Sequence, residues 1–157
     1  MADRLIFGER EVEFMQELVR KKVRFMIVGL AAAALQGAPV VTQDVDLWFA
    51  DLAQEGIANA LKKVHGSYVP PTPSTPPMFA GRGIELFDIV VHMHGLGTFS
   101  EELEHTIRIR LGRTKIPVLK LERIIASKKA TGRAKDKLAV KVLSDALKTI
   151  RETRGNA

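Results

Sequence analysis

The chain contains no cysteine among its 157 residues. This absence excludes disulfides and thiolate metal sites, and it permits a reducing compartment. The first residues, Met1-Ala2-Asp3-Arg4, lack the basic, then apolar, then small pattern of a secretory signal. The longest apolar stretch, near residues 25–35, is too short to span a membrane and is interrupted by Gly29. We therefore expect a cytoplasmic protein that does not enter membranes.

The charge of the chain is distributed unevenly along its length. Residues 1–106 hold 9 Lys and Arg against 14 Asp and Glu, a net charge of −5. Residues 107–157 hold 15 Lys and Arg against 4 Asp and Glu, a net charge of +11. A basic segment of this kind is typical of contact with a polyanion such as nucleic acid or nucleotide phosphates, although a solvated basic helix pair fits it equally.

Apolar residues make up 46% of the chain, enough for a folded core, and neither an internal repeat nor a domain linker is visible. We expect a single domain over residues 1–157, with a basic helical part over about 120–157. The periodicity of apolar residues predicts helices over 9–22, 30–35, 52–64, 100–105, 121–129 and 135–154, and strands over 23–28, 43–49, 84–93, 106–111 and 116–119. The proline-rich stretch 68–83 predicts a loop without regular structure. This pattern indicates an α+β fold, α/β-like, with a short mixed sheet flanked by helices.

Asp44-Val45-Asp46 is the most informative motif in the chain. It lies in an alternating apolar and polar stretch that predicts a strand, so the two carboxylates point to the same face. Like charges this close repel each other, and each is costly to bury. A divalent cation such as Mg²⁺ relieves both problems, because its positive charge offsets the charges of the carboxylates. Mg²⁺ is held by one or two carboxylates together with water and substrate phosphates. The alternative is a pair of surface acids on a half-exposed strand.

Asp88 lies in a nearly continuous apolar run, where an acid needs a partner to offset its burial. If the strands that contain Asp46 and Asp88 pair in one sheet, the three acids converge on one metal site. The alternative for Asp88 is an ion pair with Arg82 or a helix lysine. His92 and His94, at the end of this predicted strand and on the face of Asp88, either bind a metal or lie at the strand end in solvent.

Gly29 stands where a predicted strand turns into a helix. Glycine lets the backbone approach a ligand, and the N–H groups at the start of the helix can bind phosphate. The alternative is an ordinary turn.

These residues, taken together, resemble a known superfamily. Val28-Gly29 before a helix of small residues, then Thr42-x-Asp44-x-Asp46, then Asp88, look like the nucleotidyltransferases typified by DNA polymerase beta. The run from Leu121 to Asp136, which includes Lys128 and Gly132-Arg133, is also similar to theirs. The resemblance covers about residues 23–136 in three blocks, and it is closest to small bacterial enzymes of the minimal antibiotic type and of the abortive-infection toxin type.

The resemblance implies metal-dependent transfer of a nucleotide from an NTP to a hydroxyl on a protein, an RNA or a small molecule. It implies that Asp44, Asp46 and Asp88 hold Mg²⁺ or Mn²⁺ and carry catalysis. The residues that it places near the nucleotide are Gly29, Leu30, Thr42, Lys128 and Arg133.

Two positions depart from the family pattern. Leu30 stands where relatives usually have Gly or Ser, and Ala139 stands where toxin relatives often have another Asp. A second hypothesis follows: a catalytically degenerate protein that binds nucleotide, RNA or a partner protein, with a toxin–antitoxin pair as one setting. A third, a basic nucleic-acid-binding module, lacks a helix-turn-helix or aromatic-ladder signal.

Overall fold

A computed structural model describes residues 7–155, so both ends of the expected 1–157 domain lie outside the described residues. The elements in chain order are α2 (Glu9–Arg20), β1 (Phe25–Val28), α3 (Gly29–Leu35), β2 (Val45–Phe49), α4 (Glu55–Lys63), β3 (Ser67–Val69), β4 (Met78–Ala80), β5 (Phe87–Val90), α5 (Phe99–Leu103), β6 (Thr106–Leu111), β7 (Thr114–Leu119), α6 (Leu121–Thr131) and α7 (Ala134–Gly155).

The strands form one seven-stranded mixed sheet in the order β3-β4-β5-β2-β1-β7-β6. β2 pairs parallel with β5 and β1 pairs parallel with β7, while the other neighbours are antiparallel. The helices flank this sheet, so the predicted α+β fold with a mixed sheet is confirmed. None of the helices within residues 7–155 is both long and apolar enough to cross a membrane.

Aromatic side chains fix the central strands between their covering helices. On one face, Phe14 of α2 contacts Phe79 and Phe87, with ring centroids 5.2 and 5.4 Å away. On the other face, Trp48 of β2 lies edge-on to Phe99 of α5, with centroids 5.7 Å apart. All five rings are buried. Since aromatic pairs add to the energy of area burial, these contacts hold β2 and β5 rigidly at the centre of the sheet.

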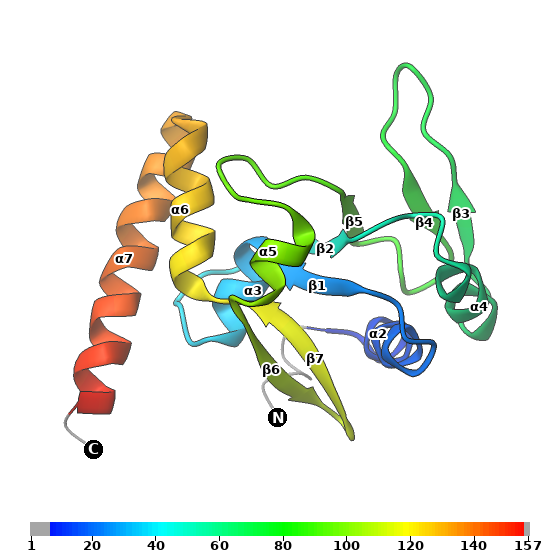
Figure 1. Cartoon of the computed structure of the whole chain (residues 1–157), viewed down its shortest axis with the longest axis horizontal. Helices are drawn as coiled ribbons and strands as arrows, with labels where there is room; N and C mark the ends of the chain where they lie inside the picture. The colour runs from blue at the N-terminus through cyan, green and yellow to red at the C-terminus, as the bar shows by residue number, and fades with distance from the viewer. Residues whose placement is uncertain (1–6, 156–157) are drawn as a thin grey trace.

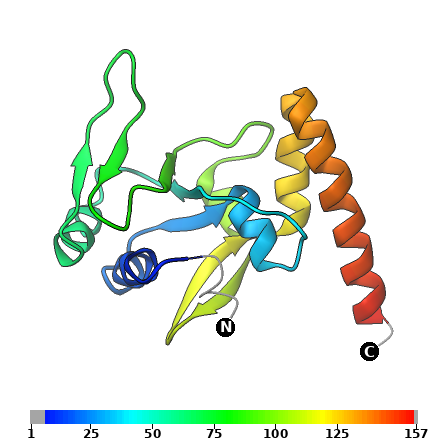
Figure 2. The same ribbon diagram turned by 180° about the vertical axis from the view of Figure 1, so that it is seen from behind.

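Two projecting units lie at opposite ends of the molecule. The helices α6 and α7 lie side by side at one end, and the β3–β4 hairpin extends at the other, with the sheet between them (Figure 1). The reverse view in Figure 2 shows the same separation. Whatever binds at the middle of the sheet therefore meets a helical unit on one side and a hairpin on the other.

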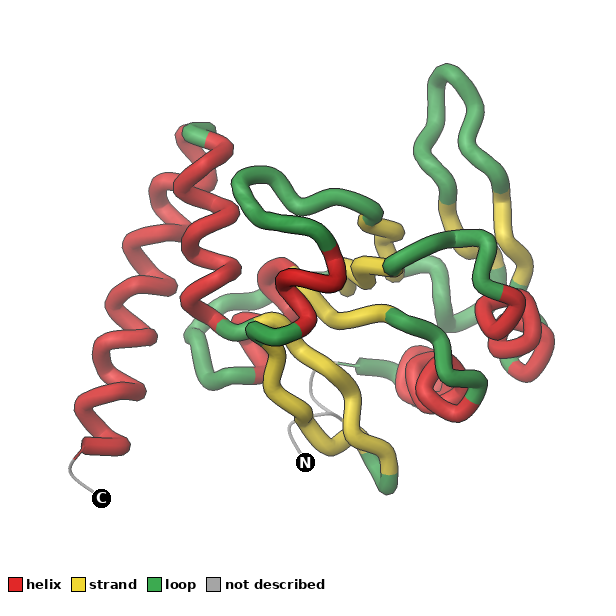
Figure 3. Tube along the Cα trace, in the orientation of Figure 1, coloured by secondary structure: helices red, strands yellow, loops and turns green. Residues whose placement is uncertain are grey.

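The prediction of an irregular loop over 68–83 is wrong. This stretch contains most of β3 and all of β4, joined by the hairpin drawn as a long green loop between two strands in Figure 3, with a bridge between Thr72 and Thr75. Tyr68 and Phe79 pair across the hairpin and give it a hydrophobic face, since Phe79 is buried in the core. The prolines lie between the two strands, where no ladder hydrogen bond is needed.

The strand predicted over 84–93 is shorter in the structure, where β5 covers only Phe87–Val90. Turns occupy the preceding residues, with Gly83 at a φ of 88°. After Val90 the chain leaves the sheet and runs as a loop toward α5. His92 and His94 therefore lie in this loop and not on a strand face.

Candidate active site

Asp46 of β2 and Asp88 of β5 lie directly opposite each other in the sheet. The parallel register pairs Val45 with Phe87, Asp46 with Asp88 and Leu47 with Ile89. Opposite residues in paired strands share a face, so the two carboxyl groups project together. The apolar neighbours face the core, which leaves this acid pair at the centre of the opposite face of the sheet.

The two acids perturb each other's ionisation. Burial, together with the charge and the hydrogen bond of Asp88, raises the pKa of Asp46 to about 6. Partial burial and the charge of Asp44 also raise the pKa of Asp88. A raised carboxyl pKa means that the ionised pair is unfavourable in this setting, so the acid pair attracts a proton or a cation.

Asp44 lies one residue before β2 and is exposed. Its charge raises the pKa of both Asp46 and Asp88, so the three predicted acids are close enough to interact electrostatically. Within residues 7–155, however, no group of three or more acidic or histidine side chains is already arranged as a metal site. What the sheet presents is a carboxylate pair with a third acid beside it.

This donor set fits a hard divalent cation. Mg²⁺ takes one or two protein carboxylates and fills the rest of its shell with water and phosphate oxygens, so it does not require a complete protein cage. Burial and the neighbouring acids together raise the pKa of Asp46, and a carboxyl group perturbed in this way is typical of a functional site.

Gly29, the first residue of α3, packs against Asp46. Its φ is +70°, and a Cβ placed there would collide with the Asp46 carboxylate. Only glycine meets both conditions, because it accepts a positive φ and has no side chain. The helix start carries no side-chain cap, so its backbone N–H groups face the neighbourhood of the acid pair without a competing side chain.

Leu30 and Thr42 take different positions around this turn. Leu30, in the first turn of α3, is partly buried and packs against the hydrophobic core. Thr42 donates a hydrogen bond from Oγ1 to the backbone oxygen of Asp44 at 3.0 Å. Thr42 thereby holds the backbone that enters β2, a role that positions Asp44.

Lys128 approaches the acid pair from α6. Its charge lowers the pKa of Asp46, opposing the larger effects of burial and Asp88. Its Nζ also lies 3.5 Å from Oδ1 of Asp136, and its side chain is only 19% exposed. Lys128 therefore stands between Asp136 and the acid pair, with its charge acting on both.

Arg133 does not extend freely from the break at Gly132. Its Nε donates to Oδ2 of Asp136 at 2.6 Å, although its side chain is 63% exposed. Gly132 ends α6 in the left-handed conformation with a φ of 68°. The turn between the two helices thus brings Lys128 and Arg133 onto one carboxylate.

Asp136, the last residue of the run from Leu121 that resembles the nucleotidyltransferases, lies at the centre of this contact. Its side chain is 1% exposed and accepts hydrogen bonds from Thr131 and Arg133. Together with the charge of Lys128, these bonds lower its pKa to about 2. The spacing of Arg133 and Asp136, three residues apart at a helix start, was the available signal, because such residues are neighbours on a helix.

The loop between β5 and α5 packs against α6. The backbone oxygen of His94 accepts a hydrogen bond from Oγ of Ser127 at 2.7 Å, and the next residue, Gly95, leaves no room for a Cβ beside Ala130. His94 is thus attached to α6 through its backbone, while its side chain and that of His92 are exposed. The loop joins the strand of Asp88 to the helix of Lys128.

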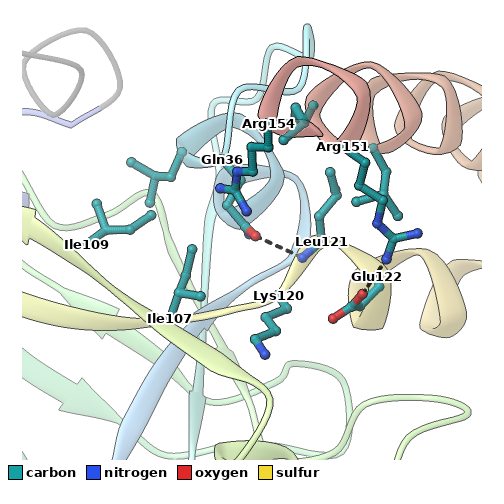
Figure 4. Close-up of a pocket in the computed structure, with 11 residues that line it drawn as sticks. Gln36, Ile107, Ile109, Lys120, Leu121, Glu122, Arg151 and Arg154 are labelled. Carbon is teal, nitrogen blue, oxygen red and sulfur yellow. Dashed lines mark hydrogen bonds and ion pairs between the residues drawn. The ribbon is translucent and has the colours of Figure 1, made fainter. Parts of the chain in front are cut away.

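A cavity of about 460 Å³ lies at the C-terminal end of α3 and the N-terminal end of α6 (Figure 4). Figure 4 shows Oε1 of Gln36 accepting a hydrogen bond from the backbone N–H of Leu121, at the start of α6. Gly29 and Lys128 lie seven residues from these two, about 10 Å along each helix. The cavity is therefore separate from the acid pair.

No protein-family model matches the chain, and no curated protein matches its sequence. Solved structures with the same fold do exist. The antibiotic-resistance factor ANT(2'')-Ia in solution superposes with a TM-score of 0.61 at 13% identity, over 94% of this chain and 86% of that one. Its crystal structure with adenylyl-2''-tobramycin gives 0.58 at 12% identity, over 86% of both chains. A proposed nucleotidyltransferase from Thermotoga maritima gives 0.59 at 20% identity, over 92% of this chain and 89% of that one.

The chain therefore has the fold of small nucleotidyltransferases, as its sequence motifs predicted. At these identities the likeness establishes the fold alone.

Proposed function

We propose that the protein transfers a nucleotide from an NTP to a hydroxyl acceptor. The observation that carries this proposal is the acid pair of Asp46 and Asp88, opposed in register beside the glycine turn at Gly29. Two carboxylates held together in this way are seldom retained for stability, because burial and the charge of Asp88 raise the pKa of Asp46 and so disfavour its ionised form. The nucleotidyltransferase fold of the chain supports the same function.

Asp46 and Asp88, with Asp44 beside them, would hold Mg²⁺ or Mn²⁺. When bound, the metal would neutralise charge on the triphosphate and on the oxygens that attack and leave. Asp88 is the more exposed of the pair, so Asp88, or water near it, would accept the proton of the acceptor hydroxyl.

The remaining predicted residues would bind the nucleotide. The backbone N–H groups at Gly29 and Leu30 would meet the phosphates, because the start of α3 lies against Asp46. Lys128 would add a positive charge on the opposite side, from α6. Arg133, held through its Nε, keeps its exposed guanidinium available to phosphate or base. Thr42 would act by holding Asp44.

A second candidate is a degenerate protein that binds nucleotide, RNA or a partner without catalysis, including as a member of a toxin–antitoxin pair. The observation that favours it is Leu30, whose partly buried side chain occupies the first turn of α3. A bulky residue there reduces the room for a triphosphate and offers no hydroxyl to bind it.

Calorimetric titration of each NTP with Mg²⁺ tests the proposal directly. Asp46→Asn should weaken metal-dependent NTP binding by at least about tenfold, corresponding to about 1.4 kcal/mol. Asp145→Asn is the matched control, since it removes an exposed carboxylate, 71% accessible, on α7. Equal NTP affinity in the wild type and Asp46→Asn would refute the proposed metal site. NTP binding without transfer to any acceptor would favour the degenerate alternative.

A further inference from the structure

The row of residues that contains the acid pair continues across the sheet onto the hairpin. Asp46 is opposite Asp88, Asp88 is opposite Met78 of β4, and Met78 is opposite Val69 of β3. Because residues opposite each other share a face, all four side chains project from the same side of the sheet. The candidate site is thus continuous with the β3–β4 hairpin.

The hairpin part of this row is apolar and open. Met78 is 41% exposed and Val69 is 36% exposed, and Ala80, two residues along β4 from Met78, is also exposed. We call Val69, Met78 and Ala80 the apolar platform. The orientation of the platform is fixed, because the other face of the hairpin places Phe79 in the core against Phe14. These side chains are therefore held toward solvent beside Asp88.

The hairpin carries no charge. Residues 66–81 contain no Asp, Glu, Lys, Arg or His. The basic group that acts on the acid pair, Lys128, comes instead from the helical unit at the opposite end of the molecule (Figure 1), where Arg133 lies on the same carboxylate of Asp136. The phosphates of an NTP therefore fit the helical side. The acceptor would then bind on the side of the hairpin.

The uncharged platform offers no charged partner to two classes of acceptor. A nucleic acid is held mainly by cations on its phosphates, and the hairpin offers none. A polycationic small molecule is held by acids, and the hairpin offers none of these either. The platform does fit an uncharged chain with apolar side groups.

The dimensions of the platform favour a polypeptide. β4 and β3 add two strand spacings beyond Asp88, a span of about 10 Å, which three extended residues cover. β3 is the outermost strand at this edge of the sheet, so a segment that crosses β4 and β3 leaves the platform without meeting a further strand.

We infer that the acceptor is an uncharged segment of a polypeptide, which lies over the apolar platform and presents a Ser, Thr or Tyr hydroxyl at Asp88. This inference rests on the proposed nucleotide transfer. The hydroxyl oxygen forms a bond to the α-phosphorus of the NTP, and the bond from that phosphorus to the oxygen that bridges to the β-phosphate breaks. Pyrophosphate leaves, and the hydroxyl proton passes to the Asp88 carboxylate.

The experiment uses synthetic peptides with a central Ser, Thr or Tyr between uncharged apolar residues. Matched peptides carry Glu or Lys flanks, and a single-stranded RNA serves as the alternative acceptor. Each is incubated with the full-length protein, Mg²⁺ and NTP labelled on the α-phosphate, and transfer is quantified by mass spectrometry. NTP affinity is measured separately by calorimetry.

The test variant is Val69→Lys combined with Met78→Lys, two exposed sites where a lysine can remain in solvent. Pro73→Lys combined with Ser74→Lys is the matched control, since it adds the same charge at the exposed turn of the same hairpin, away from the platform. We expect the test variant to lower kcat/KM for the uncharged peptides by about tenfold or more, mainly through KM, with NTP affinity unchanged. The control variant should match the wild type.

Two results would overturn the inference while leaving nucleotide transfer intact. They are labelling of RNA in preference to every peptide, and equal peptide labelling by the test variant and the wild type. NTP binding with neither peptide nor RNA labelled would overturn the inference and favour the degenerate alternative. Loss of NTP binding in the wild-type protein is a different result, because it removes the proposed function itself.

Discussion

Replacing Asp46 by Asn should stabilise the protein when no metal is present. Burial and the neighbouring acids raise the pKa of Asp46 from 3.8 to about 6. Each pKa unit corresponds to about 1.4 kcal/mol, so ionising Asp46 opposes folding by at most about 3 kcal/mol, and partial exposure reduces this to roughly 2 kcal/mol. Asn keeps the size of the side chain and a donor for the hydrogen bond to Asp88, but it carries no charge.

The sign of the pH dependence follows from the raised pKa. Between about pH 4 and 6 the folded wild type holds a proton on Asp46 that the unfolded chain has lost, so wild-type stability falls as the pH rises through this window. The amide introduced by Asp46→Asn does not titrate. The stability advantage of Asp46→Asn should therefore be small below about pH 4 and complete above about pH 6.

Urea denaturation in EDTA measures this effect, with Trp48 as the fluorescent probe because it is the single tryptophan and is buried. Asp145→Asn, which removes an exposed carboxylate on α7, should change stability by less than about 0.5 kcal/mol at any pH. Addition of Mg²⁺ and NTP should reverse the order, because ligand that binds only the folded wild type stabilises it. If Asp46→Asn is less stable than the wild type in EDTA near neutral pH, the repulsion between the paired acids is not what we infer.

Three further predictions concern the surroundings of the site. Asp136→Asn should lower stability by about 2 kcal/mol at neutral pH, because the folded structure lowers the pKa of Asp136 to about 2. This loss of stability should disappear as the pH falls from about 4 to about 2. Urea denaturation across this pH range measures it. Gln36→Ala should destabilise the fold by about 1–3 kcal/mol in thermal denaturation, because the Gln36 side chain hydrogen-bonds the backbone of Leu119 and Leu121. Arg151→Ala is the control, since it removes an exposed ion pair and should change stability by less than about 1 kcal/mol. Leu30→Ser should raise NTP affinity in calorimetry by about tenfold if one or two phosphate hydrogen bonds are gained, and unchanged affinity would show that Leu30 does not limit binding.

Local patterns in the sequence determined most of the fold class and the identity of the acids. The alternation around Asp44-Val45-Asp46 predicted a strand because strand side chains repeat every two residues. The positions of β1, β2, β6 and β7 follow from similarly short signals, within a few residues at their ends. The glycine at the turn between β1 and α3 was also recognisable, because the need for a positive φ is local.

Only the tertiary structure decided which of these residues meet. The register that opposes Asp46 and Asp88 depends on the pairing of strands about forty residues apart, and no local periodicity specifies such a pairing. The β3–β4 hairpin was missed because its hydrophobic face exists only when Phe79 packs on Phe14 of a distant helix. Asp136 gained part of its role in the same way, since Lys128 reaches its carboxylate only after α6 and α7 pack together around Gly132, whereas the contact with Arg133 is local. Side-chain types and local spacing are properties of the chain, whereas partners, burial and shifted pKa values arise from contacts that form on folding.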